Sequence, residues 1–138
     1  MKVAVGDAIP GLEVTADPER MKTMALILRD PNPIHWDVAA VTRLGLGDRP
    51  VNQGPNNMAY VVNMLVGWAG DVAALRSIRV RFLAPAFAGD RLRTGGTVTG
   101  VRVEDGARAV DCEVWLDSGE VRVIAGDATL VFPPDEAA

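Results

Sequence analysis

Apolar and polar residues alternate along much of the second half of the chain. From Arg76 onward, Ile78, Val80 and Phe82 alternate with polar residues, which is the period of a strand with one buried face. The same pattern predicts further strands over residues 92–101, 107–116 and 121–132. Successive strands with short connections favour an antiparallel sheet.

The connections between these strands carry turn residues. Glu104-Asp105-Gly106-Ala107 and Asp117-Ser118-Gly119-Glu120 are typical of hairpins. Gly95 and Gly96, inside a predicted strand, indicate a bulge or bend that helps the sheet to curl. Pro133 and Pro134 end the last strand, and the residues after them are expected to form a loose tail.

In the first half of the chain, the apolar residues have the longer spacing that is typical of helices. Asp17 followed by Pro18 predicts a helix start, and the helix must end before Pro31. Asp37 is expected to cap a short helix over 38–44, closed by Gly45. Its carboxylate is therefore assigned a structural role.

A third helix is predicted from residue 55 to 68, and it is apolar on nearly every side. Such a helix is expected to be buried rather than amphipathic. Asn56, Tyr60, Asn63 and Gly67 break the pattern and share one narrow stripe. Two interpretations of this stripe stay open: polar groups satisfied at a subunit contact or against the sheet, and groups that face a substrate.

Composition narrows the class of protein. The 138 residues fit one domain, expected to span 1–138, and a formal net charge of −4 argues against nucleic-acid binding. Cys112 is the single cysteine, so no internal disulfide forms and a cytoplasmic location is expected. One histidine without clustered acidic partners argues against a metal site. The longest apolar run is too short to cross a membrane.

Asp30-Pro31-Asn32-Pro33-Ile34-His35 contains that single histidine, five residues after an aspartate. Prolines restrict the backbone on both sides of Asn32, so the loop should be stiff. An imidazole and a carboxylate on one rigid loop can share a water molecule and add it to a double bond. From the residues alone, the same run is also that of an ordinary turn with a surface histidine.

This motif resembles the D-x4-H signature of the MaoC-like hydratases and dehydratases. The resemblance extends over most of the chain. It includes Val5-Gly6-Asp7, the segment Val51-Asn52-Gln53-Gly54 before the apolar helix, and 80–90 with its Pro85 and Gly89-Asp90 turn. It implies an α+β protein with a single hotdog fold, in which an antiparallel sheet wraps around a central buried helix.

The resemblance also implies an activity and a site. It implies reversible hydration of a trans-2-enoyl thioester to a (3R)-3-hydroxyacyl thioester, with Asp30 and His35 as the catalytic pair that activates water. The start of the apolar helix presents free amides, so Gly54 is expected to bind the thioester carbonyl. Asn32, Gln53 and Asn56 complete the predicted substrate-binding residues, and no metal or other cofactor is implied. Family members commonly have His-Gly where this chain has Gln53-Gly54, which we interpret as a change in substrate placement.

Several alternatives stay open. The thioester is carried by coenzyme A or by an acyl carrier protein, and Arg76, Arg79, Arg81, Arg91 and Arg93 are candidates for binding phosphates. The protein is expected to be a homodimer or higher oligomer, or one subunit of an unequal hotdog pair that resembles steroid and bile-acid hydratases. In the second case the motif could be idle and the chain could mainly shape a partner's tunnel. A hotdog thioesterase is disfavoured because those enzymes generally lack this loop.

Overall fold

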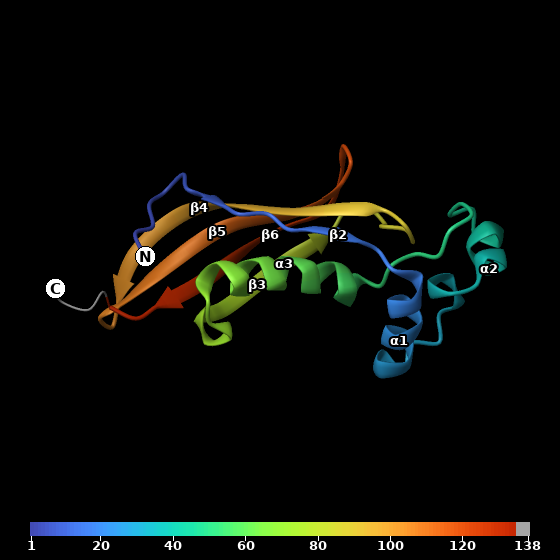
Figure 1. Ribbon diagram of the computed structural model, residues 1–138, viewed down its shortest axis with the longest axis horizontal. Coiled ribbons are helices and arrows are strands. Elements are labelled where there is room, and N and C mark those ends of the chain that lie inside the picture. The colour runs from blue at the N-terminus through green and yellow to red at the C-terminus, as the bar shows by residue number, and fades with distance from the viewer. Residues whose placement is uncertain (135–138) are drawn as a thin grey trace.

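The computed structural model describes residues 1–134, and its centre is an antiparallel sheet that curves over one long helix (Figure 1). The strands are β1 (Ala8–Ile9), β2 (Glu13–Thr15), β3 (Leu75–Phe82), β4 (Arg91–Glu104), β5 (Ala107–Ser118) and β6 (Val121–Phe132). Their order is β1-β4-β5-β6-β3, and β2 also pairs with β4. This architecture confirms the predicted α+β hotdog fold.

The alternating strands turn one face toward the helix, as their period predicted. Leu92, Leu116 and Ile124 lie on that face and are almost fully buried. Together with Met64 and Leu65 of the helix, they belong to one continuous hydrophobic core. Burial of this apolar area is the main force that holds sheet and helix together.

The predicted bulge at Gly95 and Gly96 is wrong. Both residues pair regularly with β5, and the register shift lies between Val98 and Gly100. A Cβ atom at Gly95 would stand 2.3 Å from the Trp115 indole nitrogen, so a close side chain across the sheet explains this glycine.

The helices are α1 (Pro18–Leu28), α2 (Val38–Arg43) and α3 (Gly54–Ala69), with single 3-10 turns η1 (Pro33–His35) and η2 (Val72–Ala74). The Asp17 and Asp37 side chains accept backbone N–H bonds at the starts of α1 and α2, as predicted. Figure 1 shows α3 against the sheet, with α1 and α2 beyond one end of it. The predicted tail after Pro134 lies outside the described residues.

The central helix is covered on one side only. Val61, Met64 and Leu65 are buried, whereas Asn63 and Gly67 are exposed. The prediction that this helix is buried rather than amphipathic is therefore wrong for the single chain, because one sheet covers only one side of a helix. The uncovered side leaves room for a second molecule.

Candidate active site

Asp30 lies in a sharp turn at the end of α1. Arg29 ends that helix in the left-handed conformation, with φ of 52°, and the Asp30 N–H donates to the Ala25 carbonyl at 3.0 Å. The Asp30 carboxylate accepts the Asn32 N–H at 3.0 Å, and the Asn32 side-chain oxygen accepts the Ile34 N–H at 3.3 Å. Two such side-chain turns in succession add hydrogen bonds to the backbone restraint that is expected from the prolines.

His35 is buried and held from both sides of its ring. Its Nδ1 lies 2.6 Å from the Val51 carbonyl oxygen, and its Nε2 lies 3.2 Å from Oδ2 of Asp30. Because a carbonyl only accepts, Nδ1 carries a proton and the lone pair of a neutral imidazole is at Nε2. The Val51 N–H in turn donates to the Ile34 carbonyl at 2.8 Å, so the two segments hold each other.

The Val51 segment is itself fixed against the chain before β4. The Asn52 N–H donates to the Ala86 carbonyl at 2.7 Å, and the Ala88 N–H donates to the Pro50 carbonyl at 2.9 Å. Arg49 lies nearby and donates to Asp90 at 2.7 Å. These bonds determine where the Val51 carbonyl lies, and therefore how the His35 ring is oriented.

Side-chain amides form a buried network at the start of α3. Gln53 donates to the Met21 carbonyl at 2.8 Å and accepts from Asn56 at 3.0 Å. Asn52 accepts from Asn56 at 3.1 Å and donates to the side-chain oxygen of Asn57 at 2.8 Å and to the Tyr60 hydroxyl at 3.1 Å. The network ties α3 to α1, the helix that leads to Asp30.

Gly54 begins α3 beside a groove. The groove has a volume of about 370 Å³ and is lined by Asn52, Gly54, Asn57, Phe82, Leu83, Ala84 and Pro85. Pro55 follows Gly54 and lacks an N–H, so the Gly54 amide is one of few free donors at this end of the helix. A Cβ atom at Gly54 would lie 3.2 Å from the Phe82 ring, so the absence of a side chain keeps this amide accessible.

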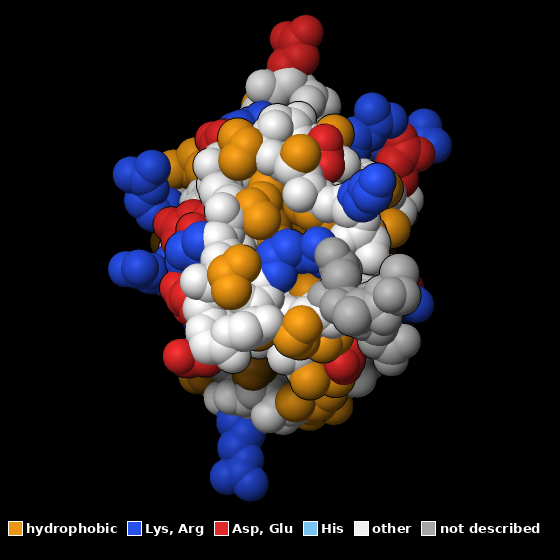
Figure 2. Space-filling view, turned by 90° about the vertical axis from the view of Figure 1, so that its left-hand side faces the viewer, with side chains coloured by type: hydrophobic (Ala, Val, Ile, Leu, Met, Phe, Trp, Pro, Cys, Tyr) orange, Lys and Arg blue, Asp and Glu red, His pale blue; other side chains and the backbone are white. Residues whose placement is uncertain are grey.

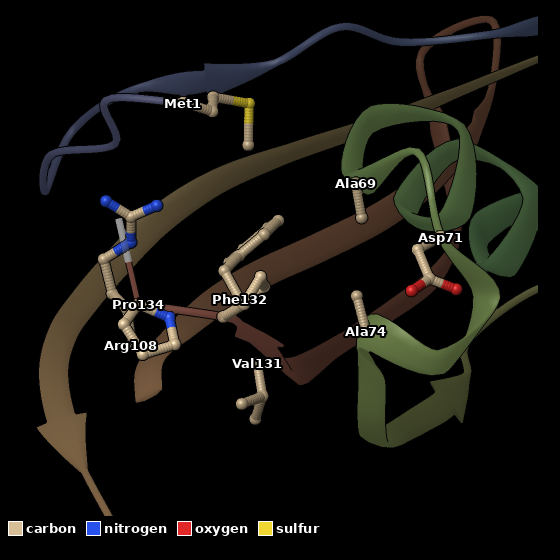
Figure 3. Close-up of a pocket in the computed structure, with 9 residues that line it drawn as sticks. Met1, Ala69, Asp71, Ala74, Arg108, Val131, Phe132 and Pro134 are labelled. Carbon is tan, nitrogen blue, oxygen red and sulfur yellow. The ribbon is translucent and has the colours of Figure 1, made fainter. Parts of the chain in front are cut away.

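A separate pocket of about 370 Å³ lies at the other end of α3. Its lining includes Ala69 at the end of the helix, Ala74 and Phe132 (Figure 3). Figure 2 looks onto this end of the molecule, where hydrophobic side chains are interspersed with charged ones. None of the predicted site residues lines this pocket.

Other chemical groups lie apart from the loop. Burial, and then the charge of Asp111, raises the pKa of the Cys112 thiol to about 11, so this thiol is not a reactive nucleophile. Among the candidate phosphate ligands, Arg76 pairs with Glu104 and Arg93 pairs with Glu13. Within residues 1–134, no group of three or more His, Cys, Asp or Glu side chains could hold a metal ion, and no helix is long and apolar enough to span a membrane.

The model of the MaoC-like domain family matches residues 4–118, which include the loop, the helix start and most of the sheet. The chain belongs to the MaoC-like family. This confirms the recognised resemblance, and it makes the protein an enzyme of the hydro-lyase class.

Relatives of this MaoC-like chain include subunits of larger assemblies. The chain is 32% identical over 97 residues to the 3-oxo-4,17-pregnadiene-20-carboxyl-CoA hydratase beta subunit of Mycobacterium tuberculosis, covering 70% of this chain and 74% of that protein. The ChsH1-ChsH2 complex from the same organism gives a TM-score of 0.79 at 25% identity, over 94% of this chain and 98% of the matched one. The (R)-hydratase from A. caviae also gives 0.79, at 20% identity, over 96% and 98%.

The sequence predicted some residues of the candidate site and missed others. The structure brings Asp30, Asn32 and His35 together on one loop, and it places Gln53, Gly54 and Asn56 at the start of α3. The Gln53 and Asn56 amides bond to protein groups rather than facing the groove. The supporting residues Val51, Asn52 and Phe82 were not predicted, since their contacts with the site depend on the folded arrangement.

Proposed function

We propose that this MaoC-like protein adds water reversibly to a trans-2-enoyl thioester and forms a (3R)-3-hydroxyacyl thioester. The observation that carries the proposal is the Asp30-His35 contact of 3.2 Å, in which Val51 directs the basic nitrogen toward the carboxylate. Two acceptors at this distance are favourable only with a proton between them or with a water molecule beside them that donates to both. A water bound by this pair has its protons directed to bases and its oxygen free to attack.

In the proposed reaction, the oxygen of this water forms a bond to C3 while one of its protons passes to the Asp30-His35 pair. The π electrons of the double bond move toward the thioester carbonyl and generate an enolate-like oxygen. The Gly54 amide, at the positive end of α3, stabilises that charge. The pair then returns a proton to C2, which completes the net addition of one water.

Asn32, Gln53 and Asn56 take supporting roles in this proposal. The Asn32 N–H bonds to the Asp30 carboxylate and so restricts its rotation. Gln53 and Asn56 hold Gly54 in position through the amide network, and any direct contact of these three side chains with substrate stays a prediction.

The thioester is proposed to be an acyl-CoA, because the curated relative is named as a hydratase of a CoA ester. That relative is also named as a subunit, which supports a second candidate: this chain is one member of an unequal hotdog pair. A 3-hydroxyacyl-carrier-protein dehydratase is a further alternative, since the HadBC dehydratase complex of Mycobacterium tuberculosis shares the fold with a TM-score of 0.72 at 19% identity. The proposed location is the cytoplasm.

The purified chain should hydrate enoyl-CoAs, measured by loss of the conjugated double bond and by detection of the hydroxyacyl product. Release of free CoA would instead indicate a thioesterase. No reaction with the chain alone, followed by hydration after addition of a second hotdog protein, would favour the paired subunit. Enoyl thioesters on a carrier protein, tested in parallel, separate the two carriers.

Asp30→Asn and His35→Ala should each lower kcat by about 10² to 10⁴, because either change removes a group that transfers protons to and from water. Each variant must keep a native melting curve. Asp48→Asn removes an exposed carboxylate elsewhere and should keep wild-type activity. Full hydration by a folded Asp30 or His35 variant would contradict the mechanism.

A further inference from the structure

The amide network at the start of α3 has a fixed direction. It begins at the Met21 carbonyl, which can only accept, so the Gln53 side chain must turn its nitrogen toward that oxygen, at 2.8 Å. The Gln53 oxygen then faces Asn56, and Asn56 must present its nitrogen to it, at 3.0 Å. A single backbone carbonyl therefore decides which end of each amide is nitrogen and which is oxygen.

The same rule fixes the next two amides of the network. The Asn56 nitrogen also donates to the Asn52 oxygen at 3.1 Å, so the Asn52 nitrogen faces away from Asn56. That nitrogen donates one hydrogen to the side-chain oxygen of Asn57 at 2.8 Å and the other to the Tyr60 hydroxyl at 3.1 Å. Asn57 therefore presents its oxygen to the network, and its nitrogen lies on the opposite side of the group.

The Asn57 nitrogen ends the network and donates to no other group within residues 1–134. Asn57 is only 3% exposed, and it lines the groove beside Gly54. Asn52 also lines this groove, but both of its amide hydrogens are in bonds to protein groups. Asn57 therefore brings an uncommitted side-chain donor to the groove, and a buried donor of this kind is normally satisfied by water or by a ligand.

The Asn57 carboxamide lies at the level of the helix start. Helical side chains lean toward the N-terminus of their helix, and the 2.8 Å contact shows that Asn57 reaches back to Asn52, which precedes Gly54. Residues three positions apart on a helix, as Gly54 and Asn57 are, share a face with Cβ positions about 5 to 6 Å apart. The Asn57 backbone N–H donates to the Gln53 carbonyl at 3.1 Å, so its side chain is the part that can bind a ligand beside the Gly54 amide.

We infer that the Asn57 side-chain amide is a second hydrogen-bond donor to the thioester carbonyl oxygen, beside the Gly54 N–H. This inference rests on the proposed hydratase function. Addition of water at C3 shifts the π electrons onto that oxygen, so two donors stabilise the negative charge until C2 takes its proton. Donors that gain strength as the charge develops raise kcat rather than substrate affinity. Asn57 is thereby a catalytic residue, and the amides that set its orientation are positioning residues, namely Gln53, Asn56 and Asn52.

Asn57→Ala tests this assignment, with Tyr60→Phe as the matched control. Each change removes one acceptor of the Asn52 amide, so each leaves one hydrogen bond of the network unmade. Only Asn57→Ala also removes a donor from the groove, because Tyr60 does not line it. Asn57→Asp is a second variant, which keeps an oxygen for Asn52 and exchanges the nitrogen for another oxygen, so it removes the donor without that loss.

Both Asn57 variants should lower kcat by about 10² to 10³, the usual cost of one donor to such an oxygen, with little change in KM. The substrate is crotonyl-CoA, or the shortest enoyl-CoA that the wild type hydrates. Tyr60→Phe should keep most of the wild-type kcat at a melting temperature similar to that of Asn57→Ala. Undiminished kcat in a folded Asn57 variant, or an equal fall in Tyr60→Phe, would overturn the assignment.

An infrared measurement separates direct contact from a structural role. The saturated analogue of the substrate, butyryl-CoA for crotonyl-CoA, cannot be hydrated, and a carbon-13 label at C1 isolates its carbonyl stretch. Because hydrogen bonds lower this frequency, Asn57→Ala should return it toward the value of the free thioester, whereas Tyr60→Phe should keep the wild-type frequency. A wild-type frequency in Asn57→Ala would overturn the second donor alone. A wild-type protein that hydrates no enoyl thioester would overturn the proposed function, and this inference with it.

Discussion

Asp90 is the residue that connects the site to the sheet. Its carboxylate accepts from the Phe87 N–H at 3.0 Å, from the Ser118 hydroxyl at 3.1 Å and from Arg49 at 2.7 Å. Burial alone would raise the pKa of this carboxyl, but the hydrogen bonds and the charge of Arg49 outweigh burial, and the net pKa is lowered. Asp90 thereby holds the segment that presents the Val51 carbonyl to His35.

The lowered pKa of Asp90 predicts a loss of stability in acid. A carboxyl group whose pKa is lower in the folded state stabilises the fold above its unfolded pKa, and that stabilisation is lost as the pH falls through the folded pKa. Asp90→Asn should lower the free energy of unfolding at pH 7 by about 1.5 to 3 kcal/mol, since hydrogen bonds to a charged group are lost. Urea unfolding from pH 7 down to pH 3 measures this difference. A gap between wild type and variant that does not narrow in acid would contradict the assignment.

At the scale of the elements, the period of apolar residues and the cap residues predicted the longer strands and the helix starts. Contacts between segments that are distant in the sequence were missed. The strands of the sheet and the caps at Asp17 and Asp37 follow from residues close in sequence. β1 and β2 are two and three residues long, too short for an alternating pattern to identify. The hydrogen bond from Gln53 to the Met21 carbonyl joins residues that are 32 positions apart, so no pattern of neighbouring residues could predict it.

The catalytic loop illustrates the same division. Asp30 and His35 are close in sequence, so their motif indicated a shared function before the fold was known. The orientation of the imidazole depends on Val51, which is 16 residues away from His35. A motif identifies which groups can react, whereas the packing of distant segments determines how they face each other.

The start of α3 gives a test at the scale of one element. Gly54→Val should lower activity more than stability, because the added side chain would meet the Phe82 ring, which stands 3.2 Å from the Cβ position, and would crowd the amide at the helix start. Gly67→Val, in an open position of the same helix, controls for the general cost of valine in a helix, once light scattering shows that this variant keeps the wild-type oligomeric state, because Gly67 lies on the uncovered side of α3. The measurements are kcat/KM and the melting temperature. Native melting with undiminished turnover in Gly54→Val would mean that the thioester carbonyl binds elsewhere.

At the scale of the whole molecule, the single chain leaves much of its own surface uncovered. Within the described residues, β3 is the last strand on one side of the sheet, and Asn63 and Gly67 leave one side of α3 exposed. Unpaired strand edges in proteins are normally covered or joined to another strand. The polar stripe of α3 is therefore part buried and part exposed. The Tyr60 hydroxyl and the Asn56 amide bond to the network inside the chain, whereas Asn63 is exposed.

We therefore predict that the protein is at least a dimer, with the two sheets continuous and the site near the shared interface. Light scattering at micromolar concentration should give at least twice the 14.7 kDa of one chain. Asn63→Arg should shift the population toward monomer, since it places a charge on the uncovered side of α3, whereas Glu120→Arg at the β5–β6 turn should not. A wild-type monomer that hydrates substrate would refute the prediction. An inactive monomer that gains activity with a second hotdog protein would show that the pairing is unequal, in which case the second chain supplies the cover that this chain lacks.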